Sequence, residues 1–163
     1  MQNLLPKGWQ FDKTVLNDLA SQGLDTKDMW LIPPIVDLCA RLREPGHQSH
    51  GTLASEGRAA YENGILHVVL PPDTNPVLEN GSLLKGLREK AYADGKIHLH
   101  ILGALTAGLD GEKPANLAGL KQGGAIAVTN ASKGFQNDLV MLRTLEYAAT
   151  FGLKVFFYPN EPS

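Results

Sequence analysis

The chain has 163 residues, of which 43% are apolar and 20% charged, the balance of an ordinary soluble globular protein with one core. A formal net charge of -2 provides no positive field for nucleic acid or an anionic membrane. A single cysteine, Cys39, excludes an internal disulfide framework, and no apolar run approaches the roughly 20 residues of a membrane span. No basic-then-apolar leader begins the sequence, so a soluble, cytoplasmic protein is expected.

The first thirty residues are polar and irregular, apart from a short helical turn at 15–19 that Gly23 ends. Beyond them, short apolar runs alternate with helical segments. The predicted strands cover 35–38, 65–70, 97–102, 125–128 and 155–158. The predicted helices cover 52–62, 83–93, 115–122 and 138–151, and each is followed within two residues by a glycine, a common helix stop. The apolar side of the last helix is expected to include Leu139, Leu142, Leu145, Tyr147 and Ala149.

This alternation predicts parallel βα units, because strands buried on both faces are apolar throughout. The strand at 35–38 is expected to be buried in this way. Five such units fit an open doubly wound sheet, and they also fit the first five strands of a (β/α)8 barrel, which takes about 250 residues. Periodicity alone leaves both architectures open.

Segment 36–46 carries the most informative motif and reads Val-Asp-Leu-Cys-Ala-Arg-Leu-Arg-Glu-Pro-Gly. It resembles the first barrel strand of the dihydroorotases, cyclic amidohydrolases of pyrimidine synthesis. That family writes Asp-Leu-His-x-His-Leu-Arg-Glu-Pro-Gly and binds its catalytic zinc with the two histidines. Cys39 and Arg41 occupy the histidine positions here. An arginine keeps its proton in a protein and so has no lone pair to offer zinc.

Four further segments follow the same family in order and at matching spacing. They are Ala-Ser-Glu-Gly-Arg-Ala-Ala at 54–60, Pro-Pro-Asp-Thr-Asn-Pro at 71–76, Gly-Ala-Leu-Thr-Ala-Gly-Leu at 103–109 and Leu-Glu-Tyr-Ala at 145–148. The resemblance implies a partial (β/α)8 TIM barrel of the metallo-dependent hydrolase type, about its first five strands, over 31–163. It also implies that 1–30 are a short N-terminal segment, the remnant of a small β-rich domain.

The resemblance places further metal positions of the family on this chain. The fourth-strand ligand falls at Asn130, a neutral and weaker zinc ligand, and the fifth-strand histidine falls at Tyr158. The remaining histidine and the aspartate base belong to the sixth and eighth strands, which this sequence does not reach. Cys39, Arg41, Asn130 and Tyr158 are therefore predicted as degenerate metal positions. No bound zinc, no other cofactor and no catalytic residue are expected, although active relatives use zinc.

Substrate recognition is half retained under the same resemblance. Arg43 matches the arginine that holds the substrate carboxylate, a role suited to its planar fork. Asp73 replaces the partner asparagine and would repel a carboxylate substrate. Both are predicted as vestigial substrate-binding residues. Arg43 could instead pair with a carboxylate such as Asp37, and Cys39 is expected to be an inert buried filler rather than a nucleophile.

His98 and His100 lie at i and i+2 of one predicted strand, so they share a face, and this is a metal-ligand spacing. Their neighbours Ile97, Leu99 and Ile101 are expected to pack against helices on the opposite face. No third ligand is evident, so hydrogen-bonded histidines in the barrel interior or near a pore-like end are favoured over a metal site. His47 and His50 are expected in a solvated loop.

One dihydroorotase-like subfamily matches these losses, the non-catalytic subunit of certain bacterial aspartate carbamoyltransferases, which holds catalytic trimers in a larger complex. The resemblance implies a pseudoenzyme whose partner is the aspartate carbamoyltransferase catalytic chain, with no nucleic acid and no membrane. One alternative is a divergent zinc-dependent cyclic amidohydrolase with relocated ligands such as His98 and His100. Another is a non-functional truncated fragment, whose open sheet edges would favour self-association.

Overall fold

A computed structural model describes residues 13–23 and 32–158 of the chain. The chain divides into two compact units, Met1–Pro34 and Ile35–Ser163. In the first unit, α1 spans Lys13–Ser21 and contains the helical turn predicted at 15–19. The origin of 1–30 as the remnant of a β-rich domain stays a prediction. Among the described residues, no helix has the length and apolar character needed to cross a membrane.

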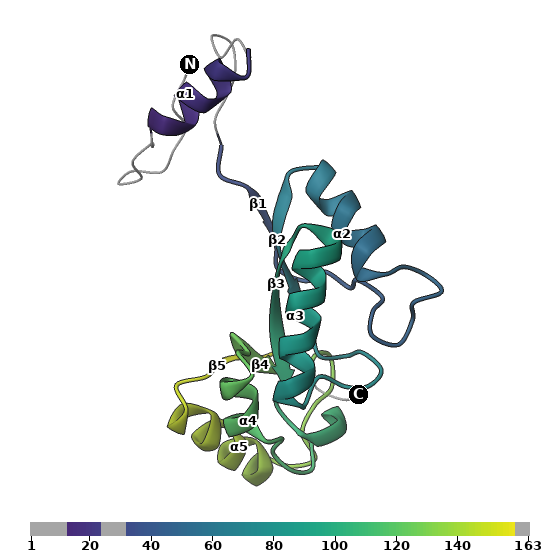
Figure 1. The fold of residues 1–163 in the computed structure, drawn as a ribbon. Coiled ribbons are helices and arrows are strands. Elements are labelled where there is room, and N and C mark those ends of the chain that lie inside the picture. Colours follow the sequence, from purple (N-terminus) through teal and green to yellow (C-terminus); the bar gives the residue numbers. More distant parts are fainter. Residues whose placement is uncertain (1–12, 24–31, 159–163) are drawn as a thin grey trace. The chain divides into compact units, whose positions relative to one another are not determined.

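The second unit is built on one sheet of five parallel strands in the order β1-β2-β3-β4-β5 (Figure 1). The strands are β1 Ile35–Asp37, β2 Ile65–Leu70, β3 His98–Ala104, β4 Ala127–Thr129 and β5 Lys154–Phe156. The helices are α2 Leu53–Glu62, α3 Gly81–Gly95, α4 Leu117–Gln122 and α5 Asp138–Thr150, with a 3-10 turn, η1, at Ala107–Leu109. Every strand pairs with its neighbour in the chain, whereas a doubly wound sheet reverses its order at a switch point. The predicted partial TIM barrel is confirmed as a curled half-barrel.

The main core lies between the sheet and its helices, where Figure 1 shows α2 and α3 side by side. Alternate strand residues such as Val68 and Ile101 are fully buried there. We call the opposite side of the sheet the inner face; it includes His67, His98 and His100 together with a second, smaller core cluster of Val69, Leu102 and Ala127. The helix-packing face predicted for β3 is thus confirmed.

The first strand differs from expectation because its side chains are not buried. Ile35 is 53% exposed and Val36 is 49% exposed. β1 lies at the edge of the sheet and pairs only with β2. In the described part of the second unit, no strand pairs with its free edge. A continuous apolar run indicates a strand that is suited to burial on both faces. Whether the strand is buried depends on the elements that surround it.

Two glycines at or near the ends of elements allow close packing. Gly95 is the last residue of α3 and precedes the left-handed C-cap Lys96 (φ 61), and a Cβ on Gly95 would meet the Leu53 carbonyl oxygen of α2 at 2.6 Å. Gly103 belongs to β3, and a Cβ there would meet Leu120 of α4 at 2.8 Å. Both glycines let a helix approach a neighbouring backbone closely.

The buried side of α5 also differs from the predicted one. Leu139 is 62% exposed and Leu142 is 52% exposed, whereas Thr144 and Ala148 are fully buried. The Thr144 hydroxyl donates to the Val140 carbonyl at 2.7 Å, so its polar atom is satisfied inside the helix and can be buried. The predicted apolar side is therefore wrong for Leu139 and Leu142, whereas Tyr147 packs against the core as expected.

A buried carboxylate, Glu44, joins the loop after β1 to two helices. Its Oε2 accepts from the Leu53 N–H at the start of α2 (2.8 Å), and its Oε1 accepts from Lys90 Nζ of α3. Burial alone would raise the pKa of Glu44, but the hydrogen bonds from Lys90 and Leu53 outweigh it and lower the pKa below the usual value. This ionised side chain fixes the loop that carries Arg41 and Arg43.

Candidate site at the carboxyl ends of the strands

The predicted site residues follow the carboxyl ends of four strands. Cys39 and Arg41 come after β1, Asp73 after β2, Asn130 after β4 and Tyr158 after β5. This is the end at which TIM barrels carry their sites, because the βα loops converge there. The half-barrel thus places these residues on one end of the sheet.

An ion pair joins the ends of β1 and β2. Arg41 Nη2 and Nε both donate to Asp73 Oδ2, at 2.9 and 3.2 Å. The hydrogen bond to Asp73, followed by the attraction between the two charges, raises the pKa of Arg41 further above its usual value. The partner of Asp73 is therefore Arg41, at one of the predicted degenerate metal positions, and not Arg43.

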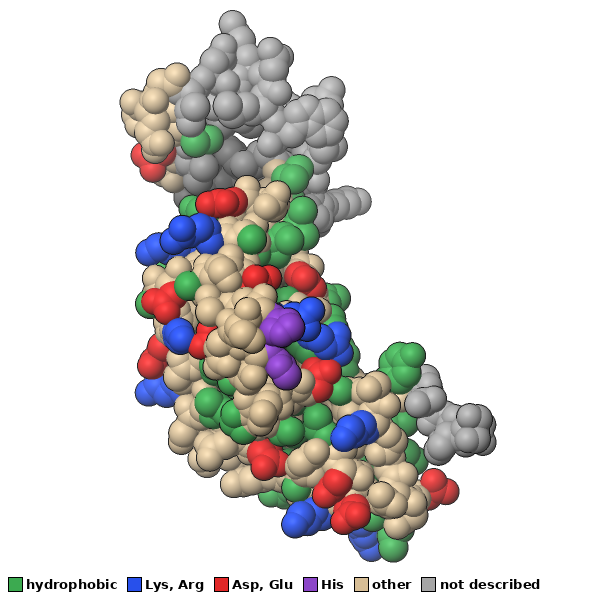
Figure 2. Space-filling view, turned by 90° about the vertical axis from the view of Figure 1, so that its right-hand side faces the viewer, with side chains coloured by type: hydrophobic (Ala, Val, Ile, Leu, Met, Phe, Trp, Pro, Cys, Tyr) green, Lys and Arg blue, Asp and Glu red, His purple; other side chains and the backbone are tan. Residues whose placement is uncertain are grey.

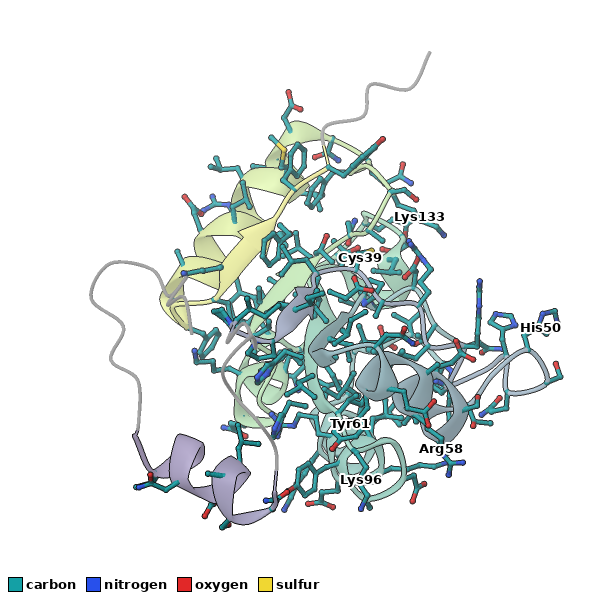
Figure 3. All side chains as sticks on the ribbon, turned by 90° about the horizontal axis from the view of Figure 1, so that it is seen from above. Cys39, His50, Arg58, Tyr61, Lys96 and Lys133 are labelled. Carbon is teal, nitrogen blue, oxygen red and sulfur yellow. The ribbon has the colours of Figure 1, made fainter. Side chains whose placement is uncertain are left out.

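Cys39 is exposed, so the expectation of a buried filler was wrong. Its backbone N–H donates to Asp37 Oδ1 at 2.9 Å, and Arg41 Nη1 lies 3.6 Å from its sulfur. The first of these contacts occupies the Asp37 carboxylate, the alternative partner predicted for Arg43. Figure 3 labels Cys39 near the middle of the view, beside the strands of the sheet. Its side chain lies beside a cation and within reach of solvent.

Three of the four predicted metal positions line one hollow of about 450 Å³ on the inner face. Cys39 and Arg41 line one side, and Tyr158 lies with Phe156 and Phe157 on the other. All three aromatic side chains are more than half exposed. The structure thus brings together Cys39, Arg41 and Tyr158, but it does not bring Asn130 into the hollow.

Asn130 is buried (4% exposed) and holds a turn. Its Oδ1 accepts from the backbone N–H of Thr106 (3.1 Å) and from the Thr106 hydroxyl (2.7 Å), while its Nδ2 donates to the Gly134 carbonyl (3.3 Å). The Thr106 hydroxyl oxygen in turn accepts from the Gly111 N–H at 3.0 Å. This network ties the 103–109 motif to the loop after β4. No pattern in the sequence had indicated this role.

The zinc implied by the family resemblance does not fit these side chains. Arg41 carries a cation that repels a metal ion, and the amide oxygen of Asn130 already accepts two hydrogen bonds. In the described ranges 13–23 and 32–158, no group of three or more His, Cys, Asp or Glu side chains is arranged to hold a metal ion. The correspondence of the four residues to the family's ligand positions stays a prediction.

Arg43 lies beside a small cavity of about 40 Å³ lined also by Arg41, Asp73 and Thr74. Its backbone is left-handed (φ 64), a conformation that costs a non-glycine residue about 1 kcal/mol. Within the described part of the chain, its exposed guanidinium makes no hydrogen bond or ion pair, so the alternative pairing with Asp37 is absent. Its predicted role toward a substrate stays a prediction.

Two of the resemblance motifs pack against each other at this cavity. The N–H of Asn75, in the 71–76 motif, approaches the carbonyl of Pro45 at 3.4 Å. Gly46 has φ 105, and a Cβ there would meet the Asn75 carbonyl oxygen at 2.5 Å. Only glycine fits this position, so the Pro-Gly end of the first motif has a structural reason.

His98 and His100 lie on the inner face as predicted, and a third histidine joins them. His67 of β2 lies opposite His98 in the sheet register, and its Nδ1 is 3.1 Å from Nε2 of His100. The interior hydrogen bonding expected for the pair is confirmed for His100. Sequence reasoning missed His67, although its place in the strand at 65–70 could have located it.

The described polar surface outside the site includes an exposed loop and a face of mixed charge. His47 and His50 are exposed, and Figure 3 shows His50 at the tip of a loop that points away from the strands. On the face seen in Figure 2, acidic and basic side chains are interspersed. This mixture agrees with the small net charge and provides no basic patch for a polyanion there.

Comparison with known proteins supplies the family. The family model described as "Dihydro-orotase-like" matches residues 29–161. A "Dihydroorotase-like protein" of Pseudomonas aeruginosa is 38% identical over 138 residues, which cover 85% of this chain and 33% of the relative. A protein of the same name from Pseudomonas putida is 37% identical over 142 residues, covering 87% of this chain and 34% of the relative.

A "Dihydroorotase" of Desulforapulum autotrophicum is 36% identical over 144 residues, covering 86% of this chain and 34% of the relative. The chain thus spans about one third of the length of the curated relatives it matches. The matched residues include the whole half-barrel sheet and every predicted site residue. This chain belongs to the dihydroorotase-like family.

Proposed function

We propose that this chain is a non-catalytic dihydroorotase-like protein that supports the assembly of aspartate carbamoyltransferase in pyrimidine biosynthesis, in the cytoplasm. The observation that carries the proposal is the ion pair between Arg41 and Asp73. A cation and its counter-ion stand where the resemblance expects a metal ligand and a substrate-binding residue. The two charges offset each other, so the site has little affinity for either a metal ion or a carboxylate substrate.

The names of relatives and the exposed apolar side chains at the edges of the sheet support the same proposal. Two Pseudomonas relatives are called dihydroorotase-like proteins rather than dihydroorotases. Exposed apolar side chains at the edges of the sheet, among them Val36 and Phe156, are suited to burial against further protein. The partner and the assembly role come from the resemblance stated above and are the part of the proposal that needs testing.

Mixing this chain with the aspartate carbamoyltransferase catalytic chain of the same source should move the catalytic trimer to a larger species on a sizing column. The experiment uses micromolar concentrations of both chains, so that a moderate affinity is detected. Arg43→Ala is the control variant and should keep the shift, because this side chain is exposed and makes no hydrogen bond or ion pair with the described residues. Absence of any shift would contradict the assembly role and favour the truncated-fragment alternative.

The purified protein is expected to contain far less than one zinc per chain and to leave dihydroorotate unhydrolysed. The Cys39→His, Arg41→His double variant should also be inactive, because Asn130 remains committed to Thr106 and Tyr158 remains a phenol. Metal analysis and a hydrolysis assay, run beside an active dihydroorotase, measure both. Stoichiometric zinc together with hydrolysis would instead support the divergent amidohydrolase. Loss of that zinc in His98→Gln would then identify His98 as one of its ligands.

A further inference from the structure

The inner face carries a cluster of three histidine rings outside the site at the strand ends. His67 comes from β2, and His98 and His100 come from β3. The ring centroids of His67 and His98 are 4.9 Å apart with an interplanar angle of 19°, and those of His67 and His100 are 5.4 Å apart at 24°. All three lie in the amino-terminal halves of their strands, away from Cys39 and Asn130.

The contact between His67 and His100 determines how many hydrogens the two facing ring nitrogens carry. Their facing nitrogens, Nδ1 and Nε2, are 3.1 Å apart, a hydrogen-bond distance. A neutral imidazole has one N–H donor and one acceptor nitrogen, so one of the facing nitrogens carries hydrogen and the other accepts it. If both rings become imidazolium, both nitrogens carry hydrogen and the bond is replaced by repulsion between two cations.

The described side chains around the cluster are mainly cationic or uncharged. Arg88, Glu89 and Tyr92 of α3 line a hollow of about 500 Å³ with His98 and His100, and the Tyr92 ring lies 5.5 Å from that of His98. Tyr61 of α2 and Lys96 line a neighbouring hollow with His98. On the β1 side, His67 is paired in register with Val36, which has no charge.

Glu89 is the one carboxylate lining these two hollows, and it lies 4.0 Å from Lys85. Among the described residues, no carboxylate forms an ion pair with any of the three rings. Arg88 and Lys96 add positive charge near the cluster. A proton added to it thus meets other cations and no paired anion.

We propose that His67, His98 and His100 form an acid-sensitive element that holds β2 and β3 together when neutral and weakens the fold when it is protonated. The hydrogen bond between His67 and His100 ties the two strands across the inner face at neutral pH. Acidification places cations on adjacent rings and removes this tie. The inference concerns the stability of the half-barrel and is independent of the assembly role.

The direction of the pH dependence follows from His100. Burial, followed by the charges of His67, His98 and Arg88, lowers the pKa of His100 below the usual 6.5. The unfolded chain therefore binds this proton more readily than the folded chain does. The stabilising contribution is complete above about pH 6.5 and is lost as the pH falls from there toward the folded-state pKa of His100.

The test is urea unfolding of the full 163-residue chain between about pH 8 and about pH 5.5, with a chelator present so that metal does not contribute. The folding equilibrium constant should fall by up to about tenfold per pH unit for each proton taken up on unfolding. His100→Gln cannot take up this proton and should flatten the profile. His50→Gln removes a histidine from the exposed loop and should keep the wild-type slope.

Glu44 does not confuse this result, because its stabilising contribution is lost only below its usual pKa of 4.5. If His100→Gln does not fold, His67→Gln takes its place, since a glutamine amide can still bond to the His100 ring. Nitrogen-detected NMR of the imidazoles at neutral pH should show one protonated and one bare nitrogen at the contact. A wild-type slope in the variant, or independent titration of His67 and His100, would overturn the proposal.

Discussion

Replacing Asn130 with alanine is expected to lower the free energy of unfolding by about 3 kcal/mol. The substitution removes the acceptor of both the N–H and the hydroxyl of Thr106, which is fully buried. It also removes the donor to the Gly134 carbonyl. Buried polar groups left without partners cost more than the net value of the bonds themselves, because they had to give up water on folding. Urea unfolding followed by circular dichroism measures the loss.

Asn137→Ala is the matched control, since it also truncates an asparagine, but at the exposed N-cap of α5, where Oδ1 accepts from the Val140 N–H. Loss of that cap should cost only about 1 kcal/mol. A double-mutant cycle with Thr106→Val should reveal coupling of about 1 kcal/mol or more, because the two side chains share a bond. Equal losses in Asn130→Ala and Asn137→Ala, or a cycle without coupling, would show that the buried network is not a stabilising unit.

The same network bears on function. An asparagine at a predicted metal position could be a weakened ligand or a side chain with another task. Its oxygen accepts two hydrogen bonds from Thr106, and those bonds fix the motif at 103–109 against the end of β4. A domain that acts by assembly needs these loops held in place, even if no metal binds between them. The energetic test of Asn130 therefore also measures how firmly the candidate site is built.

The strands were predictable because each is a short apolar run between turn residues, and β2 was located to the residue. Their order was not predictable from periodicity, which left the barrel and the open sheet equally possible. The first-strand motif and the four further motifs in family order decided this, and two of them, at 36–46 and 71–76, meet in the structure where Gly46 packs against Asn75. Motifs that meet in space constrain a fold more strongly than the period of a single strand.

The site was only partly predictable. Residue types at the strand ends were sufficient to suggest that Arg41 cannot bind zinc, but not that it pairs with Asp73, which lies 32 residues away. The third histidine could have been found, because parallel pairing of the strands at 65–70 and 97–102 places His67 beside His98. The exposure of Cys39 and of β1 could not have been predicted, because it depends on which elements surround the sheet.

Gly123→Ala is expected to lower the free energy of unfolding by about 3 kcal/mol, since it forces apart two helices that meet at glycine backbones. A Cβ on Gly123, the C-cap of α4, would overlap the backbone of Gly81, the first residue of α3. A Cβ on Gly81 would overlap the Gly119 carbonyl oxygen in the same way. These neighbours are main-chain atoms, so no side-chain rotation can relieve the overlap.

Gly86→Ala separates this steric effect from the general effect of replacing a glycine. Gly86 lies within α3, and a Cβ placed on it would meet no atom of the described residues within 4 Å outside the backbone of its own helix. This variant should gain up to about 1 kcal/mol from the higher helix propensity of alanine. Gly123 has φ -69, so its backbone already suits alanine and the expected loss is due to overlap with α3 alone. Urea unfolding of both variants by circular dichroism should therefore give shifts of opposite sign. Equal stability of the two would mean that α3 and α4 separate without cost, and that the spacing of β3 and β4 is set by the sheet rather than by the helices that cover it.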